Sequence, residues 1–100
     1  MKVRLTQDAE ADLETIGDWI AADNPARAVT YVRELREKCM SLVDMPLAFP
    51  LIPRYERLGV RRRAHGDYLV FYRVESGQVV VLHVLHGAMD YLPLLFSGDA

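Results

Sequence analysis

Hydrophobic and polar residues alternate with two different periods along this chain, and the change of period separates a helical part from an extended part. Between residues 7 and 42 the apolar side chains recur every three or four positions, which is typical of amphipathic helices. From residue 60 onward they form short runs rich in β-branched and aromatic residues, which favour strands. The pattern therefore predicts helices in the first half of the chain and a sheet in the second.

The N-terminal segment predicts a short strand followed by a helix. Residues 2–5 (KVRL) alternate polar and apolar, so Val3 and Leu5 should point inward. Thr6 can cap the helix that follows by accepting a hydrogen bond from a first-turn N–H. The apolar stripe of this helix has 4-3-4 spacing and consists of Ala9, Leu13, Ile16 and Ile20. We expect Trp19 to lie beside this stripe, at the border of the core.

A second helix should begin at residue 25. Asn24 is a good N-cap, and Pro25 suits the first helical position. The stripe of this helix has 4-3-4-3 spacing and consists of Ala28, Val32, Leu35, Cys39 and Leu42. Because the connection is so short, the two helices should pack as an antiparallel hairpin. Cys39 falls on the buried stripe, so we expect an inert core thiol.

Residues 45–53 contain three prolines, which prevent a regular helix and disfavour a central strand. We expect an extended crossover from the helices to the sheet. Its apolar side chains should pack against the domain: Leu47, Phe49, Leu51 and Ile52.

Residues 60–90 predict a three-stranded antiparallel meander with tight turns at residues 66–67 and 76–77. These turns predict the following cross-strand pairs: Arg61 with Tyr72, His65 with Tyr68, Tyr72 with Val81, and Val70 with His83. Neither face of the meander is purely polar, so the pattern leaves open which face the helices cover. A one-residue bulge would change the assignment of side chains to faces.

The C-terminal run at residues 91–96 is apolar but short, and Pro93 interrupts it. Two interpretations stay open for this run. It is either an exposed contact surface for a partner or a segment that packs back on the helices of the domain.

Composition limits the class of protein. A hydrophobic content of 51% is enough for one domain over residues 1–100 with its own core. The single cysteine excludes an internal disulfide and fits a reducing cytoplasm, where we expect the protein to act. We find neither an apolar leader nor a run of membrane-spanning length, so export and membrane insertion are not expected. The net charge of −2 disfavours a protein whose main task is to grip nucleic acid.

The charges are unevenly distributed. Residues 8–23 contain six acids and no base, whereas residues 54–63 contain five arginines and one glutamate. One interpretation is a solvated acidic helix face and a soluble strand. The other is a basic binding surface on the sheet, with the acidic helix turned away from it.

No arrangement of residues indicates a metal or a nucleophile. His83 and His86 are three apart on a predicted strand and should point to opposite faces, so they cannot share a metal ion. The chain has no Gly-rich phosphate loop and no Gly-flanked Ser nucleophile. His86 and Asp90, just past the last strand, either form an acid–base pair or order the end of the sheet or a contact with a partner.

The order of the predicted elements, together with four groups of residues, resembles the RelE/ParE superfamily of bacterial toxins. The groups are Thr6, Ala9, Asp12, Leu13 and Ile16; Arg61, Arg62 and Gly66; Val70 to Val74; and Val84, Leu85, His86, Met89 and Asp90. Together and in this order they are most similar to ParE. The resemblance implies an α+β fold of βααβββ order, with an N-terminal strand, an antiparallel helix hairpin and a three-stranded antiparallel meander.

ParE toxins are known for poisoning DNA gyrase and are held inactive by a co-encoded ParD antitoxin. The resemblance therefore implies a toxin that inhibits DNA gyrase by protein binding, with no catalytic residues, no cofactor and no metal. It also implies a hetero-oligomer with a ParD-like antitoxin, and no sequence-specific nucleic-acid or membrane binding. Arginine and aromatic residues are enriched in interface hot spots. The expected contact residues are Arg61, Arg62, Arg63, Arg73, His86, Asp90, Tyr91, Leu92, Leu95 and Phe96.

RelE-type relatives instead cut ribosome-bound mRNA, which requires several cations around one phosphate. Aligned on Gly66 and on residues 72–74, two positions that are Arg in those nucleases fall on Leu69 and Met89. The loss of two cations disfavours phosphodiester cleavage. A ribonuclease that relies on Arg62 and Tyr72 is the first alternative, and a non-toxic binding module of the same fold is the second.

Overall fold

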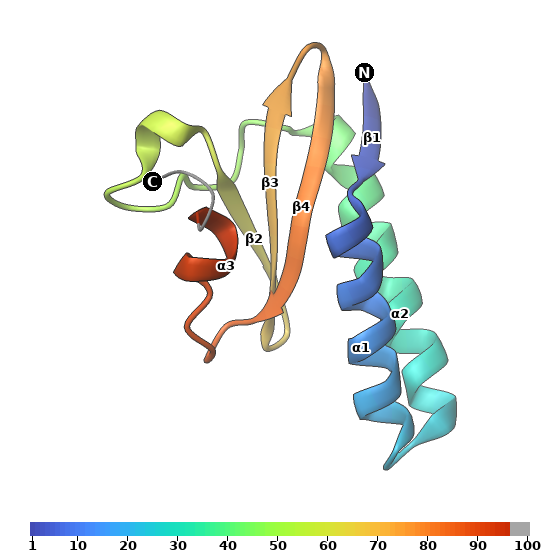
Figure 1. Ribbon diagram of the computed structural model, residues 1–100. Coiled ribbons are helices and arrows are strands. Elements are labelled where there is room, and N and C mark those ends of the chain that lie inside the picture. Colours follow the sequence, from blue (N-terminus) through green and yellow to red (C-terminus); the bar gives the residue numbers. More distant parts are fainter. Residues whose placement is uncertain (97–100) are drawn as a thin grey trace.

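A computed structural model describes residues 1–96 and confirms the α+β fold with the predicted order of elements (Figure 1). The elements are β1 (Lys2–Leu5), α1 (Gln7–Ala21), α2 (Pro25–Met40), β2 (Arg61–His65), β3 (Tyr68–Glu75), β4 (Gln78–His86) and α3 (Leu92–Phe96), with short 3₁₀ turns at Ser41–Asp44 and Glu56–Leu58. Over the described residues, every helix is too short or too polar to cross a membrane.

The four strands form one sheet in the order β1-β4-β3-β2. The meander β2-β3-β4 is antiparallel, and β1 adds to its far edge in parallel with β4. In Figure 1 the α1–α2 hairpin stands on one side of the sheet, and α3 stands on the other side with the crossover. The sheet is therefore covered on both faces.

The predicted helix caps are confirmed. The Thr6 hydroxyl accepts a hydrogen bond from the N–H of Ala9 at 3.1 Å, and the Asn24 side chain accepts one from the N–H of Arg27 at 3.1 Å. The two helices lie close together at Gly17, where an added Cβ atom would be 3.3 Å from a methyl group of Val32. A glycine here allows the hairpin to pack tightly.

The predicted strand register is correct on one side of a bulge and wrong on the other. Tyr72 pairs with Val81 as predicted, but Val70 pairs with Val84 and not with His83. Leu82 is the extra residue in β4, and its carbonyl accepts a hydrogen bond of 2.9 Å from the Thr6 hydroxyl. The bulge thus occurs where β1 ends and the chain turns into α1, a long-range feature with no local sequence signal.

The bulge settles which side chains face the helices. One core cluster lies between the sheet and the hairpin; its strand residues are Val70, Tyr72, Val79, Val81 and Val84. A second cluster lies on the opposite face; its buried residues are Ile52, Val60, Phe71 and Leu85. The crossover and α3 cover this second face. Because both faces are buried, neither shows the polar alternation of a one-sided sheet.

Two expectations about burial are wrong. Trp19 is 76% exposed and does not pack in the core, because it points away from α2. Leu47 is 64% exposed, whereas its neighbours Phe49 and Leu51 are partly buried and Ile52 is buried. Only the later part of the crossover is therefore packed against the sheet, where Ile52 donates a backbone hydrogen bond to Val60.

Candidate functional site

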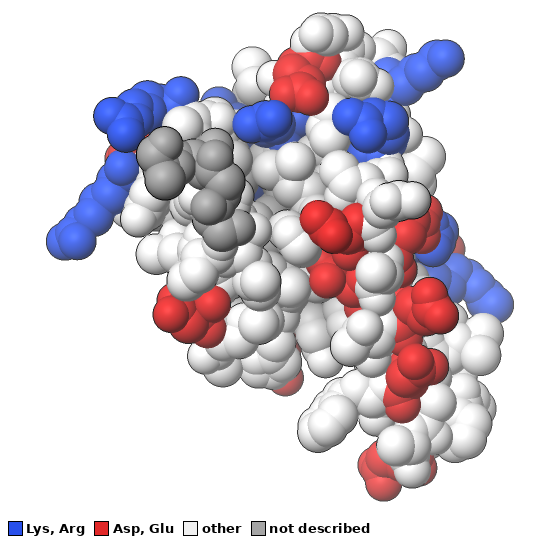
Figure 2. All heavy atoms as spheres, in the orientation of Figure 1, with Lys and Arg blue, Asp and Glu red and all other residues white. Residues whose placement is uncertain are grey.

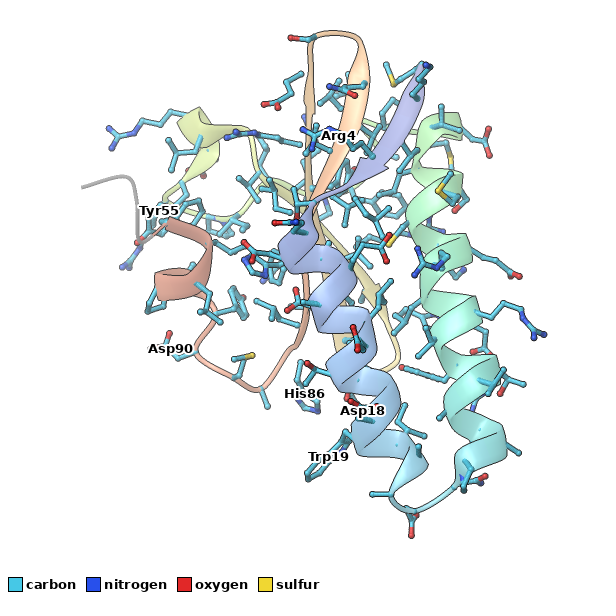
Figure 3. All side chains as sticks on the ribbon, turned by 45° about the vertical axis from the view of Figure 1, so that its right-hand side comes forward. Arg4, Asp18, Trp19, Tyr55, His86 and Asp90 are labelled. Carbon is cyan, nitrogen blue, oxygen red and sulfur yellow. The ribbon has the colours of Figure 1, made fainter. Side chains whose placement is uncertain are left out.

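An open groove lies between α1 and the segment that follows β4, and its volume is about 540 Å³. Its lining residues are Asp12, Thr15, Ile16, Trp19, Tyr68, Val84, Leu85, His86, Met89 and Leu94. Figure 3 shows Trp19 at the lower end of α1, with His86 facing it from the end of β4. We call this feature the Trp19 groove.

The walls of the Trp19 groove are more apolar than an ordinary protein surface. Trp19 on one wall is 76% exposed, and Met89 and Leu94 on the other wall are 42% and 47% exposed. Buried core residues, Ile16 and Val84, form part of the floor. Large apolar side chains exposed around a concave surface are typical of a binding site for another molecule.

Asp12 fixes the position of α1 against the sheet at one end of the groove. Its carboxylate accepts hydrogen bonds from the N–H of Val84 at 2.9 Å and from Nδ1 of His83 at 2.8 Å. Burial raises the pKa of Asp12, and these two hydrogen bonds act in the opposite direction. Beyond the end of β1, Asp12 therefore satisfies part of the β4 edge that no strand covers.

The face that carries the groove is acidic. In Figure 2, red carboxylates follow α1 on one side of the hollow and appear again on the opposite side, while Lys and Arg lie mainly at the top and the periphery. Asp12 lines the groove from α1, and Asp90 follows Met89 on the other wall. Among the described residues that line the groove there is neither Lys nor Arg.

One acidic residue of α1 is neutralised by an arginine of α2. Glu10 forms an ion pair with Arg36 of α2 at 2.7 Å, and the hydrogen bond from this guanidinium lowers the pKa of Glu10. The side chain of Asp8 is 77% exposed and lies 3.8 Å from Nε2 of His83. Of these acids, Asp12 is the one that lines the groove, whereas Asp8 lines the neighbouring hollow beside His83 and Arg73.

The three predicted contact arginines of β2 bind oxygen atoms of the protein itself. Arg61 donates to the carbonyls of Leu47 and Phe49 at 3.1 and 2.8 Å. Arg63 donates to the carbonyl of Lys38 at 3.2 Å and to the Ser41 hydroxyl at 2.7 Å. These two arginines thus tie the crossover and the end of α2 to the sheet.

Arg62 lies on the opposite face of β2 and donates to the Tyr91 hydroxyl at 3.0 Å. Its register partner is Phe71 of the second core cluster, whereas Arg61 pairs with Tyr72 of the first. The three guanidinium groups are therefore divided between two faces and do not form one basic surface.

The remaining predicted polar contact residues are separated from one another. Arg73 forms an ion pair with Glu75 at 2.8 Å on β3. His86 stacks edge-on against Tyr68, and its Nδ1 accepts a hydrogen bond from the N–H of Ala88 at 3.0 Å. Asp90 is exposed and points away from His86, so within residues 1–96 the two do not form the acid–base pair that the spacing allowed. They also contain no group of three or more metal-binding side chains.

The C-terminal run packs on the body of the protein, on the sheet face opposite the hairpin. The four predicted contact residues Tyr91, Leu92, Leu95 and Phe96 are partly buried in the second cluster. Within the run, Leu94 is the residue that turns into the groove. The run therefore packs on the sheet, an arrangement that differs from both interpretations that the sequence left open.

The groove residues Trp19, Met89 and Leu94 were not among the predicted contact residues. One signal was present, since Asp12, Thr15, Ile16 and Trp19 follow a 3-1-3 spacing that places them on one helix face. Their partners on the other wall come from a segment some 70 residues later in the chain, so local periodicity could not connect them.

Comparison with known proteins gives consistent matches over most of the chain. Residues 3–91 match the family described as the ParE toxin of the type II toxin–antitoxin system parDE. The chain is 34% identical over 91 residues to Toxin ParE1 of Caulobacter vibrioides, covering 87% of this chain and 90% of that protein.

Two solved structures share the fold. A structure of the chromosomal ParDE system from P. aeruginosa has a TM-score of 0.74 at 22% identity, covering 86% of this chain and 95% of that one. The toxin–antitoxin complex RelBE2 from Mycobacterium tuberculosis has a TM-score of 0.64 at 27% identity, covering 88% and 92%.

Proposed function

Since this chain belongs to the ParE toxin family of type II toxin–antitoxin systems, we propose that it inhibits DNA gyrase by protein binding and is neutralised by a ParD-like antitoxin. The observation that carries the proposal is the family match over residues 3–91. The geometry supports a binding role because an open groove beside the sheet is lined by large exposed apolar side chains.

The surroundings of Arg62 and Tyr72 favour binding over RNA cleavage. Tyr72 is fully buried, and its hydroxyl donates to the carbonyl of Pro46 at 2.8 Å. Arg62 is held by Tyr91 on the other face of the sheet. A phosphate-cleaving site needs cations and a proton-transfer group around one point, and these two side chains point to opposite faces.

Two solved structures with the same fold support an antitoxin partner. The ParDE and RelBE2 structures are toxin–antitoxin systems. We expect a ParD-like antitoxin to fold a flexible segment onto this chain, since a segment that orders on binding can wrap a large surface. The product would be a hetero-oligomer without toxic activity.

The test is to purify the chain from its complex and to assay gyrase supercoiling and the integrity of ribosome-bound mRNA in parallel. Inhibited supercoiling or trapped cleaved DNA, relieved by the co-encoded antitoxin, is the expected result. Cleaved transcripts with normal supercoiling would replace the proposal by a RelE-type ribonuclease. Normal supercoiling and intact transcripts, with cells that grow normally, would indicate a non-toxic binding module.

A further inference from the structure

We propose that the outer face of the α1–α2 hairpin joins two copies of this chain into a symmetric dimer, in which α1 of each copy packs over α2 of the other. At the centre of this face is a second open groove, which we call the hairpin groove. All its lining residues belong to α1 or α2, so it opens away from the sheet (Figure 1). Its lining residues include Glu10, Glu14, Gly17, Val29, Val32 and Arg36.

The middle of the hairpin groove provides an apolar contact for a second copy. Val29 lines the groove from α2 and is 61% exposed, although the buried stripe of that helix is already complete without it. Across the groove, Gly17 of α1 contributes no side chain. The exposed valine of one copy therefore finds space beside the glycine of the other, where it loses its contact with water.

The two sides of the hairpin face carry opposite charges. On α1 the acids Glu10, Glu14 and Asp18 follow one another every four residues and line the groove. On α2 the groove is lined by Arg36. Arg33 is exposed four residues after Val29 and three before Arg36, so it lies on the same side of that helix.

These charges are only partly paired within one copy. Glu10 and Arg36 form the ion pair at 2.7 Å, and both side chains remain about half exposed. Among the ion pairs of residues 1–96, none includes Glu14 or Arg33. One acid and one base of the same face are thus available to a partner.

A face that is negative on one side and positive on the other is complementary to itself. A two-fold axis along the groove exchanges its two sides, so that α1 of one copy lies over α2 of the other. Glu14 of each copy then faces Arg33 of the other. A two-fold axis across the groove would instead place the acids of the two α1 helices over each other, which is unfavourable. Charge therefore selects the first arrangement.

The area of the face predicts a weak dimer. Helices of 15 and 16 residues are each roughly 23 Å long, and side by side they form a face roughly 20 Å wide. Two such faces bury roughly 1,000 Å² in total, at the lower end of the range for specific interfaces. We therefore expect a dissociation constant of roughly 10–100 µM.

The dimer leaves the Trp19 groove open. The two grooves share no lining residue, since α1 presents Glu14 and Gly17 to the hairpin groove but Thr15 and Trp19 to the other. Each copy in the dimer therefore keeps this apolar surface for a partner of another kind.

Sedimentation equilibrium of the full chain, separated from its antitoxin, tests the dimer at concentrations from about 1 to 300 µM. Val29→Asp places a charge in the apolar contact, and Leu47→Asp is the matched control at a position that is 64% exposed outside the hairpin. We expect Val29→Asp to weaken the dimer by about tenfold or more and Leu47→Asp to behave as the wild type. Both positions are exposed, so each variant should fold, which thermal unfolding verifies.

Charge reversal tests which residues meet across the axis. Glu14→Arg alone and Arg33→Glu alone should each weaken the dimer by about tenfold or more, because like charges then face each other twice. An equimolar mixture of these two variants should form a heterodimer, and the chain that carries both substitutions should dimerise as the wild type does. Arg57→Glu reverses an exposed charge outside the hairpin and should have no effect.

The outcomes are independent of the target of the toxin. A chain that is monomeric at about 300 µM overturns the dimer, and if it still inhibits supercoiling the proposed function stands. Equal dimerisation of Val29→Asp and the wild type, or no recovery in the chain with both charge reversals, shows that another surface is used and also overturns it. A monomeric wild type whose antitoxin binding is lost in Val29→Asp would assign the hairpin groove to the antitoxin instead.

Discussion

The carboxylate of Asp12 and the imidazole of His83 meet at 2.8 Å across the boundary between α1 and β4. The two residues are 71 positions apart in sequence, and the same carboxylate oxygen also accepts the N–H of Val84. This is the point where β1 has ended and β4 would otherwise present an uncovered edge. The Asp12 side chain thus binds a backbone N–H that a neighbouring strand would otherwise bind. It also lines one end of the Trp19 groove.

Replacing Asp12 by Ala should destabilise the protein, because the N–H of Val84 and the His83 ring lose their acceptor in a partly buried site. The expected decrease in the free energy of unfolding is about 1–3 kcal/mol. Asp12→Asn should cost less, since its amide oxygen can still accept one of the two hydrogen bonds. Urea denaturation followed by circular dichroism measures both.

Glu14 on the exposed side of the same helix provides the control for Asp12. Glu14→Ala should change the free energy of unfolding by no more than about 0.5 kcal/mol. Equal effects of Asp12→Ala and Glu14→Ala would show that the bonds across α1 and β4 contribute nothing to stability.

The turn between β2 and β3 leaves little room for a side chain at residue 66. Gly66 has φ +58°, and a Cβ atom built there would be 2.6 Å from the Tyr31 hydroxyl. Gly77 in the next turn has φ +73° with no atom within 4 Å of its Cβ position. Gly77→Ala should therefore lower the free energy of unfolding only by the penalty for a left-handed alanine, roughly 1–2 kcal/mol. Gly66→Ala should lower it clearly more.

A double-mutant cycle separates the clash at Gly66 from the backbone strain. Tyr31→Phe removes the hydroxyl that a new Cβ would meet, at the expense of its hydrogen bond to the His65 carbonyl at 3.1 Å. Gly66→Ala should thus be less harmful in the Tyr31→Phe background than in the wild type. Strictly additive free energies in thermal or urea unfolding would contradict the close approach.

Arg63 should behave in mutagenesis as a structural residue. Arg63→Ala removes hydrogen bonds to the Lys38 carbonyl and the Ser41 hydroxyl at the end of α2, and the guanidinium also stacks on Phe49 at 4.7 Å. The expected loss is roughly 1–3 kcal/mol of stability. Arg57→Ala, at an exposed position, should be nearly neutral. An unchanged melting temperature in Arg63→Ala together with weaker gyrase inhibition would instead make Arg63 a contact residue.

The elements could be predicted from the sequence because their signals are local. Each of these signals depends on residues a few positions apart. They are the N-caps at Thr6 and Asn24, the buried helix stripes that contain Leu13 and Leu35, and the turn at Gly66. The structure agrees with all of them. Helix and strand identity therefore followed from periodicity and capping alone.

The site could not be predicted in the same way, because it depends on contacts between distant segments. Leu82 bulges from β4 where Thr6 meets it, and this shift reverses the faces of the side chains that follow. Arg61 and Arg63 are of a residue type that is common at interfaces. In the fold, however, they donate hydrogen bonds to carbonyls of the crossover and of α2, which are distant in sequence. Trp19 is exposed because it lies on the side of α1 that points away from α2.

The Cys39 thiol gives the clearest dependence of stability on pH. Cys39 is fully buried on α2, and this burial raises its pKa from 9.0 to about 11. Above pH 9 the thiol of the unfolded chain ionises first, so the unfolded state binds fewer protons than the folded state. The free energy of unfolding should therefore fall as the pH rises from 9 toward 11, by about 2–3 kcal/mol for this group.

Cys39→Ala isolates that effect from the tyrosines. Burial also raises the pKa values of Tyr31, Tyr68 and Tyr72, which decreases stability in the same direction and persists in the variant. Urea unfolding under reducing conditions should show a steeper alkaline decline for the wild type than for Cys39→Ala, even though the variant is less stable at pH 7 because of the cavity. Parallel declines would mean that the thiol ionises at the same pH in the folded and unfolded chains, and hence that the site around Cys39 is open to water.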